Sequence, residues 1–176
     1  PDRPWIRNNG IDVRRVSDLV IRNVACNNAR SGGLVISWGC VNVQVKNSVF
    51  EENYFDGVAY YDSVDVVTSD CLMYNNRSAG ISLDNDVREV TFVNCELDGN
   101  GDVGVFARNS YQLLFDHCTI ANNGNWALFL AHDEREKGVY GAVISHSVVE
   151  GNRGGLRLAS VNDSQSNGIR IVATRF

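Results

Sequence analysis

Apolar and polar residues alternate with a period of two in short runs along most of this chain, as in Ile81-Ser82-Leu83-Asp84. Such alternation is typical of a β-strand with one buried face, whereas an amphipathic helix would repeat its apolar positions every three or four residues. The pattern therefore predicts a chain of many short strands.

The predicted strands recur at a fixed spacing. Five glycines are separated by intervals of 23, 24, 23 and 24 residues: Gly10, Gly33, Gly57, Gly80 and Gly104. Ala127 takes the next slot, and Gly155 follows 28 residues later because that repeat carries an insertion. Self-similarity at one period is the mark of a repeat architecture.

Each repeat contains three predicted strands. After Gly57, for example, Val58 and Tyr60 are expected to point inward and Tyr61 outward. A leucine-rich repeat would need a helical segment in every repeat, and a sandwich would not hold its columns in register over six repeats. The chain is thus predicted to be all-β, a right-handed parallel β-helix of about seven coils of ~23 residues with three short strands per coil.

Stacking the repeats gives structural roles to several reactive residues. Cys71, Cys95 and Cys118 share one inward column and are therefore interpreted as small core residues, with a disulfide ladder or a metal site as the alternative. A second column marks a bend and is expected to form a side-chain hydrogen-bond ladder. Its members are Asn23, Asn47, Asp70, Asn94, His117 and His146. Both histidines are interpreted as bend residues, and no metal site is predicted.

Composition narrows the range of functions. With 176 residues, 44% of them hydrophobic, residues 1–176 are expected to form one β-helix domain. The net charge of -5 argues against nucleic acid as the main partner, and no apolar run is long enough to cross a membrane. No capping segment is evident at either end, so the chain is expected to be a fragment of a longer protein or to have its ends covered by a partner, such as a second copy in a homo-oligomer.

A family resemblance rests mainly on one coil, from Asn53 to Gly80, which reads Asn-Tyr-Phe-Asp-Gly-Val-Ala-Tyr-Tyr-Asp and ends Tyr-Asn-Asn-Arg-Ser-Ala-Gly. This stretch resembles a coil of the bacterial alginate (mannuronan) C5-epimerases. The whole chain resembles, more loosely, the right-handed β-helix polysaccharide lyases, epimerases and glycosidases. The resemblance implies a polysaccharide lying along the outer face of the first strand of each coil, and it favours a secreted, extracellular location.

The epimerase active centre itself is not reproduced. The family carries an Asp-Pro-His stretch after a Gly, where this chain has Gly33-Leu34-Val35-Ile36-Ser37. Tyr61 stands where the next coil of the epimerases supplies an Asp, and Arg77 lies one residue out of register with a family Arg. Epimerase activity is therefore not transferred to this chain from the resemblance.

Candidate catalytic residues come from the outward column four residues after each glycine. The column reads Arg14, Ser37, Tyr61, Asp84, Arg108, Ala131 and Ala159. Tyr61, Asp84 and Arg108 are expected on successive coils, roughly 5 Å apart. Arg108 could neutralise a uronate carboxylate, Tyr61 could transfer a proton, and Asp84 could act as a base or orient Arg108.

Two alternatives remain for the same residues. Asp84 could form a glycosidase pair with Asp62 or Asp86. The Asp84–Arg108 pair could equally be a solvated ladder pair with no catalytic part.

Further candidates flank this column. Trp38, Phe106 and Phe129 are predicted sugar-stacking residues, with Arg14 and Arg77 as additional substrate-binding residues. His132 is the first residue of the insertion and is a candidate catalytic acid or base. The acidic residues of the insertion could bind Ca²⁺, although their spacing is not diagnostic of a Ca²⁺ site. The leading hypothesis is a protein that acts on or binds an acidic polysaccharide, and the alternative is a non-catalytic β-helix scaffold of a surface or tailspike-like assembly.

Overall fold

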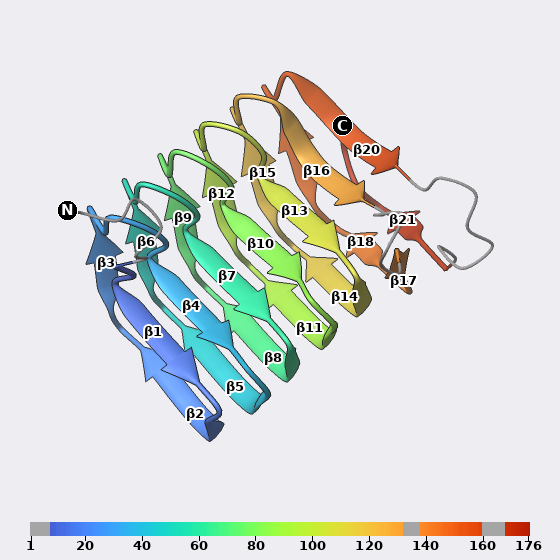
Figure 1. Ribbon diagram of the computed structural model, residues 1–176. Coiled ribbons are helices and arrows are strands. Elements are labelled where there is room, and N and C mark those ends of the chain that lie inside the picture. Colours follow the sequence, from blue (N-terminus) through green and yellow to red (C-terminus); the bar gives the residue numbers. More distant parts are fainter. Residues whose placement is uncertain (1–7, 132–137, 160–167) are drawn as a thin grey trace.

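A computed structural model describes residues 8–131, 138–159 and 168–176, and these residues form three parallel β-sheets that wind around a common interior (Figure 1). The first sheet carries the outward column. Its strands are, in spatial order, β1 (Ile11–Arg14), β4 (Leu34–Ser37), β7 (Val58–Tyr61), β10 (Ile81–Asp84), β13 (Val105–Arg108), β16 (Trp126–Ala131) and β20 (Gly154–Ala159).

The other two sheets complete each coil. The second sheet consists of β2 (Ser17–Arg22), β5 (Cys40–Lys46), β8 (Ser63–Ser69), β11 (Val87–Val93), β14 (Ser110–Asp116), β18 (Val143–Ser145) and β21 (Arg170–Val172), with β17 (Val139–Tyr140) also paired to β14. The third consists of β3 (Ala25–Asn27), β6 (Val49–Glu51), β9 (Leu72–Tyr74), β12 (Glu96–Asp98), β15 (Thr119–Ala121) and β19 (Val148–Glu150). The all-β, three-strand coil is confirmed.

The coil count differs slightly from the prediction of about seven. Within the described residues the third sheet has six strands, so six coils are complete and the seventh is partial. Register is kept from coil to coil: Ile81 of β10 pairs with Val58 of β7 on one side and with Val105 of β13 on the other. The described residues include no helix that could span a membrane.

The interior is filled by the inward columns. Tyr60, Phe92 and Phe115 are fully buried, and their rings stack with centroids 6.0 Å and 5.2 Å apart. The Tyr60 hydroxyl is paired with Thr68 Oγ1 at 2.7 Å, which satisfies both polar groups inside the core. Cys71, Cys95 and Cys118 are free and buried, as predicted for core residues.

The bend column turns the chain from the second sheet to the third, and its six members have left-handed backbones with φ between 47° and 55°. Asn and Asp tolerate this conformation better than most residues. Side-chain contacts within the column include a hydrogen bond from Asn94 to Asp70 and a stacking of His117 on His146. The ladder predicted for this column is thus formed only in part, and a continuous ladder lies in a different column.

That ladder lies inside the turn between the third sheet and the next first-sheet strand. Each side-chain amide donates to the next at 2.8–3.0 Å, in the order Asn53, Asn76, Asn100, Asn123 and Asn152. Asn100 also donates to the carbonyl of Met73 and accepts from the backbone N–H of Asn76. An inward Asn thus bonds to the coil on either side of it, which explains why this residue type recurs there.

Candidate functional site

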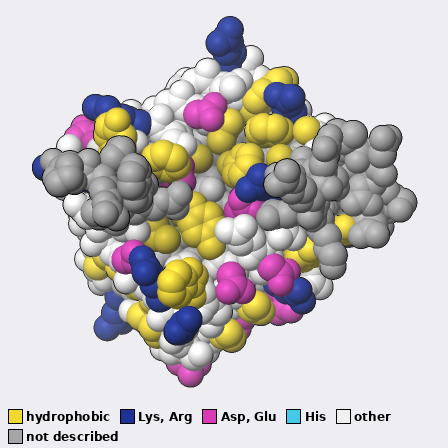
Figure 2. Space-filling view, in the orientation of Figure 1, with side chains coloured by type: hydrophobic (Ala, Val, Ile, Leu, Met, Phe, Trp, Pro, Cys, Tyr) yellow, Lys and Arg dark blue, Asp and Glu magenta, His cyan; other side chains and the backbone are white. Residues whose placement is uncertain are grey.

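A groove of about 450 Å³ lies on the outer face of the first sheet, across β1, β4, β7, β10 and β13. Viewed onto this sheet, Figure 2 shows hydrophobic, acidic and basic side chains intermingled on the face. Five of the residues predicted from sequence line the groove: Arg14, Trp38, Tyr61, Asp84 and Arg108. The parallel register explains this convergence, because residues four positions after each glycine are stacked on successive coils and Trp38 directly follows that position in β4.

An ion pair forms part of the groove wall. Arg108 donates from Nε to both carboxylate oxygens of Asp84 at 3.2 and 3.1 Å, and from Nη2 to Oδ2 at 2.5 Å. Asp84 Oδ1 also accepts the backbone N–H of Asn85 at 2.7 Å. The Asp84 side chain is 10% exposed, whereas the Arg108 side chain is 31% exposed. Asp84 therefore holds Arg108 in place, and the guanidinium is the more accessible member of the pair.

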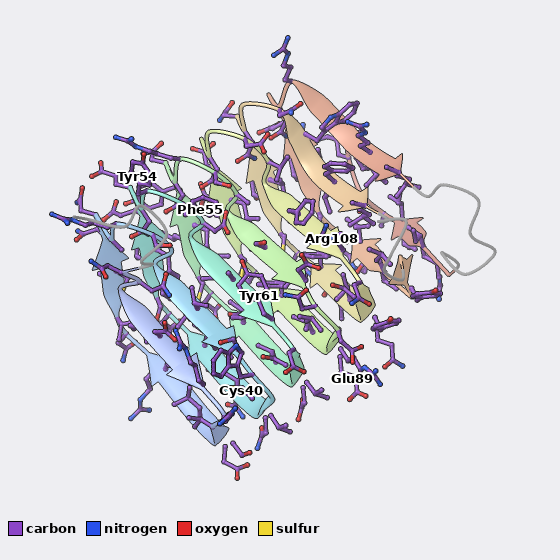
Figure 3. All side chains as sticks on the ribbon, in the orientation of Figure 1. Cys40, Tyr54, Phe55, Tyr61, Glu89 and Arg108 are labelled. Carbon is purple, nitrogen blue, oxygen red and sulfur yellow. The ribbon has the colours of Figure 1, made fainter. Side chains whose placement is uncertain are left out.

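Tyr61 lies at the end of β7, directly beside Asp84 in the sheet register. It lines both the groove and a smaller hollow beside it, and Figure 3 shows its position on β7. Asp62 follows it and lines the groove as well. A tyrosine hydroxyl both donates and accepts a proton, so Tyr61 brings a proton-transfer group into the groove occupied by Arg108.

A second ion pair borders the end of the groove at β1. Arg14 donates to Asp12 from Nε and Nη2, both at 2.8 Å, and its guanidinium lies 5.0 Å from the Trp38 ring centroid. The hydrogen bond from Arg14 is the main reason why the pKa of Asp12 is below its usual range. Trp38 remains 54% exposed and carries a second guanidinium, that of Arg15, at 5.3 Å. This exposed ring is a surface on which a sugar could stack.

The charges of the groove are nearly balanced. Three carboxylates, of Asp12, Asp62 and Asp84, line it together with two guanidinium groups, of Arg14 and Arg108. Each arginine is paired with an aspartate, so its planar donor groups are fixed in direction while its net charge is compensated. Such a surface recognises a ligand through oriented hydrogen-bond donors more than through a long-range field.

The smaller hollow, of about 230 Å³, contains the predicted Phe106. Phe55 and Asp56 line it too. Phe106 packs edge-to-face against Phe129 with ring centroids 5.8 Å apart, and Phe129 carries the guanidinium of Arg157 at 4.7 Å. The two predicted phenylalanines thus form a cluster beside the groove rather than within it.

Three other predicted residues are not among the described residues that line the groove. Arg77 lies over the Tyr54 ring at 4.7 Å, outside the residues that line the groove. Asp86 forms an exposed ion pair with Arg88 and does not line the groove either, in contrast to Asp62. His132 and most of the insertion, residues 132–137, lie outside the described residues.

Sequence reasoning missed Asp12, Tyr54 and Phe55. Asp12 stands two residues after Gly10, the position of Phe106 and Phe129 in later coils, so column analysis could have found it. Tyr54 and Phe55 are 57% and 47% exposed and lie in a turn, where no strand alternation indicates the direction of a side chain. Their exposure is visible only in the three-dimensional structure.

The chain belongs to the family described as "Right handed beta helix region", whose model matches residues 9–175. A comparison with curated proteins gave no significant match. The family assignment agrees with the observed coils and confirms the predicted fold.

Solved structures with the same fold include the periplasmic alginate epimerase AlgG, with a TM-score of 0.78 and 18% identity over 96% of this chain and 43% of that one. The pectate lyase Pel9A has a TM-score of 0.63 and 13% identity over 86% of this chain and 50% of that one. PfbA, a surface adhesin of Streptococcus pneumoniae, has a TM-score of 0.66 and 11% identity over 93% and 48%. This chain spans half or less of the length of each of these proteins.

Proposed function

We propose that this member of the right-handed β-helix family binds an acidic polysaccharide along the outer face of its first sheet and acts on it by lyase or epimerase chemistry. The observation that carries the proposal is the groove that both Tyr61 and Arg108 line, with Arg108 held by Asp84. An alginate epimerase and a pectate lyase among the structures with this fold support the same class of ligand.

In this proposal Arg108 binds the carboxylate of a uronate residue. Its hydrogen bonds stabilise the negative charge that develops on the carboxylate when the C5 proton is removed. Asp84 serves as a positioning residue, because both of its oxygens already accept hydrogen bonds from Arg108 or Asn85. Tyr61 transfers the proton.

The resulting carbanion can react in two ways. Loss of the oxygen substituent at C4, which takes up the proton that Tyr61 removed from C5, forms a C4–C5 double bond and is the lyase outcome. Delivery of a proton from solvent water to the opposite face of C5 inverts that carbon, which is the epimerase outcome. Trp38 offers a stacking surface for a sugar at the end of the groove near β1.

The test is incubation with alginate, polygalacturonate and two neutral polysaccharides. Near-ultraviolet absorbance detects the unsaturated product, and proton NMR detects C5 inversion. Tyr61→Phe and Arg108→Ala should each lower the rate at least 100-fold. The control Arg88→Ala alters an exposed arginine of the second sheet and should leave the rate unchanged. An undiminished rate in Tyr61→Phe would refute the assignment of Tyr61.

A second candidate function is a non-catalytic interaction module. It is favoured by the exposed aromatic side chains of Tyr54, Phe55 and Trp38 and by the surface adhesin among the structures with this fold. Light scattering and thermal shift separate the candidates. An obligate oligomer that no polysaccharide stabilises against heat, and that yields no product, would favour the interaction module.

A further inference from the structure

We propose that Asp116, His117 and His146 form a binding site for a divalent transition-metal ion such as Zn²⁺. The three residues lie at the bend between the second and third sheets, and their imidazole nitrogens and carboxylate oxygen lie within 4.8 Å of one another. None of the three residues lines the groove of the first sheet, and the proposal does not depend on the proposed function.

Strand register brings the three residues together. Asp116 ends β14 and pairs with Ser145, which ends β18 (Figure 1). The histidines that follow these strands therefore occupy equivalent positions on neighbouring coils, and their rings stack with centroids 4.9 Å apart at an interplanar angle of 21°. Both rings turn Nδ1 toward the same carboxylate: His117 to Oδ2 at 2.8 Å and His146 to Oδ1 at 2.9 Å.

The donor set suits zinc better than calcium or magnesium. Neutral imidazole and carboxylate are ordinary zinc ligands, whereas Ca²⁺ and Mg²⁺ prefer oxygen alone. In a tetrahedral site with bonds of about 2.0–2.1 Å, ligand atoms are about 3.3 Å apart. The present Nδ1–oxygen distances of 2.8 and 2.9 Å are a few tenths of an ångström below this spacing, and the three ligand atoms all lie within 4.8 Å of one another.

The surroundings are also suited to a metal site. Ser145 donates its hydroxyl to Asp116 Oδ1 at 2.7 Å, an outer contact that orients the carboxylate. The histidine side chains are 61% and 53% exposed, which gives an ion access and leaves its fourth position to water. Because the ligands come from two coils, the bound ion would cross-link those coils.

This combination occurs once along the bend column. The other members of the column are Asn or Asp, and the residues that precede them are Arg22, Lys46, Ser69 and Val93. The pair of Asp70 and Asn94 shows the alternative, a direct hydrogen bond of 2.7 Å with no imidazole. It provides a natural reference site in the same protein.

The test is isothermal titration of the whole chain with ZnCl₂, together with its melting temperature and its visible spectrum with Co²⁺. We expect one ion per chain, a melting temperature raised by a few degrees, and Co²⁺ bands without thiolate charge transfer. His146→Asn restores the residue type of the other coils and should weaken binding at least 10-fold. The control Asp70→Asn should bind as the wild type does.

Three results would overturn the proposal. The first is the absence of Zn²⁺ binding to the wild-type chain, and the second is unchanged affinity in His146→Asn. The third is a thiolate charge-transfer band with Co²⁺, which would place the ion at a cysteine. Stabilisation by Ca²⁺ alone would point instead to an all-oxygen site elsewhere on the chain and would also contradict this assignment.

Discussion

Two columns of this solenoid differ in whether the same residue type recurs from coil to coil. The inward column of the exit turn keeps Asn at five successive coils, from Asn53 to Asn152. The outward column of the first sheet changes residue type at almost every coil, with Ser37, Tyr61, Asp84 and Arg108 in succession. The same strand register stacks the residues of both columns, yet only the inward column repeats one residue type.

The environment of each column explains the difference. An inward amide must satisfy the same backbone groups in every coil, because no water reaches them and an unpaired buried group is costly. An outward side chain has no backbone group that it must satisfy in every coil, so its type is free to vary even where it is buried, as at Ser37 and Asp84. Constancy along a column therefore indicates architecture, while variation along an outward column indicates the positions where chemistry can be placed.

The largest expected effect tests the inward column. Asn100→Ala leaves the Asn76 N–H groups and the carbonyl of Met73 without their side-chain partner in a position that is 1% exposed. We expect a loss of about 3 kcal/mol in the free energy of unfolding, measured by urea denaturation. The control Asn125→Ala removes an exposed amide and should change stability by less than about 0.5 kcal/mol. Equal losses in the two variants would contradict the ladder's proposed role.

A smaller effect is expected from the Asp84–Arg108 pair of the outward column. Arg108→Ala should destabilise the protein by about 1–2 kcal/mol, because it leaves a largely buried carboxylate without its guanidinium partner. A double-mutant cycle with Asp84→Ala should give a coupling energy of about 1 kcal/mol. The exposed Asp86–Arg88 pair serves as the matched control and should couple by less than about 0.5 kcal/mol. Additive effects at Asp84 and Arg108 would show that Asp84 does not hold the arginine.

The smallest expected effect is a pH dependence at Asp12. Because the pKa of Asp12 is lowered in the folded protein, its ionised form adds stability above the unfolded pKa, near 3.8, and this contribution is lost as pH falls through the folded pKa. Asp12→Asn should cost about 0.5 kcal/mol at neutral pH, and the difference from wild type should shrink below pH 4. Urea denaturation between pH 7 and pH 2.5 measures it. A difference independent of pH would exclude the Arg14 ion pair as its source.

Much of the groove could be predicted from sequence because its residues share one strand position. Counting four residues from each glycine is enough to place Arg14, Tyr61, Asp84 and Arg108 on one face. The same counting could not locate Arg77, which lies in a turn and packs over Tyr54. Turn geometry depends on local backbone angles that strand alternation does not report.

The sequence by itself determined the repeat, the inward and outward assignment of the strand residues and the stacking of the columns, since period-two alternation and regular glycine spacing leave one consistent arrangement. Tertiary structure alone decided which Asn column forms the buried ladder and that Arg108 and Arg14 are already paired with aspartates. It also brought His117 and His146 to one carboxylate. These outcomes depend on side-chain directions and distances of a few ångströms, which spacing along a chain does not encode.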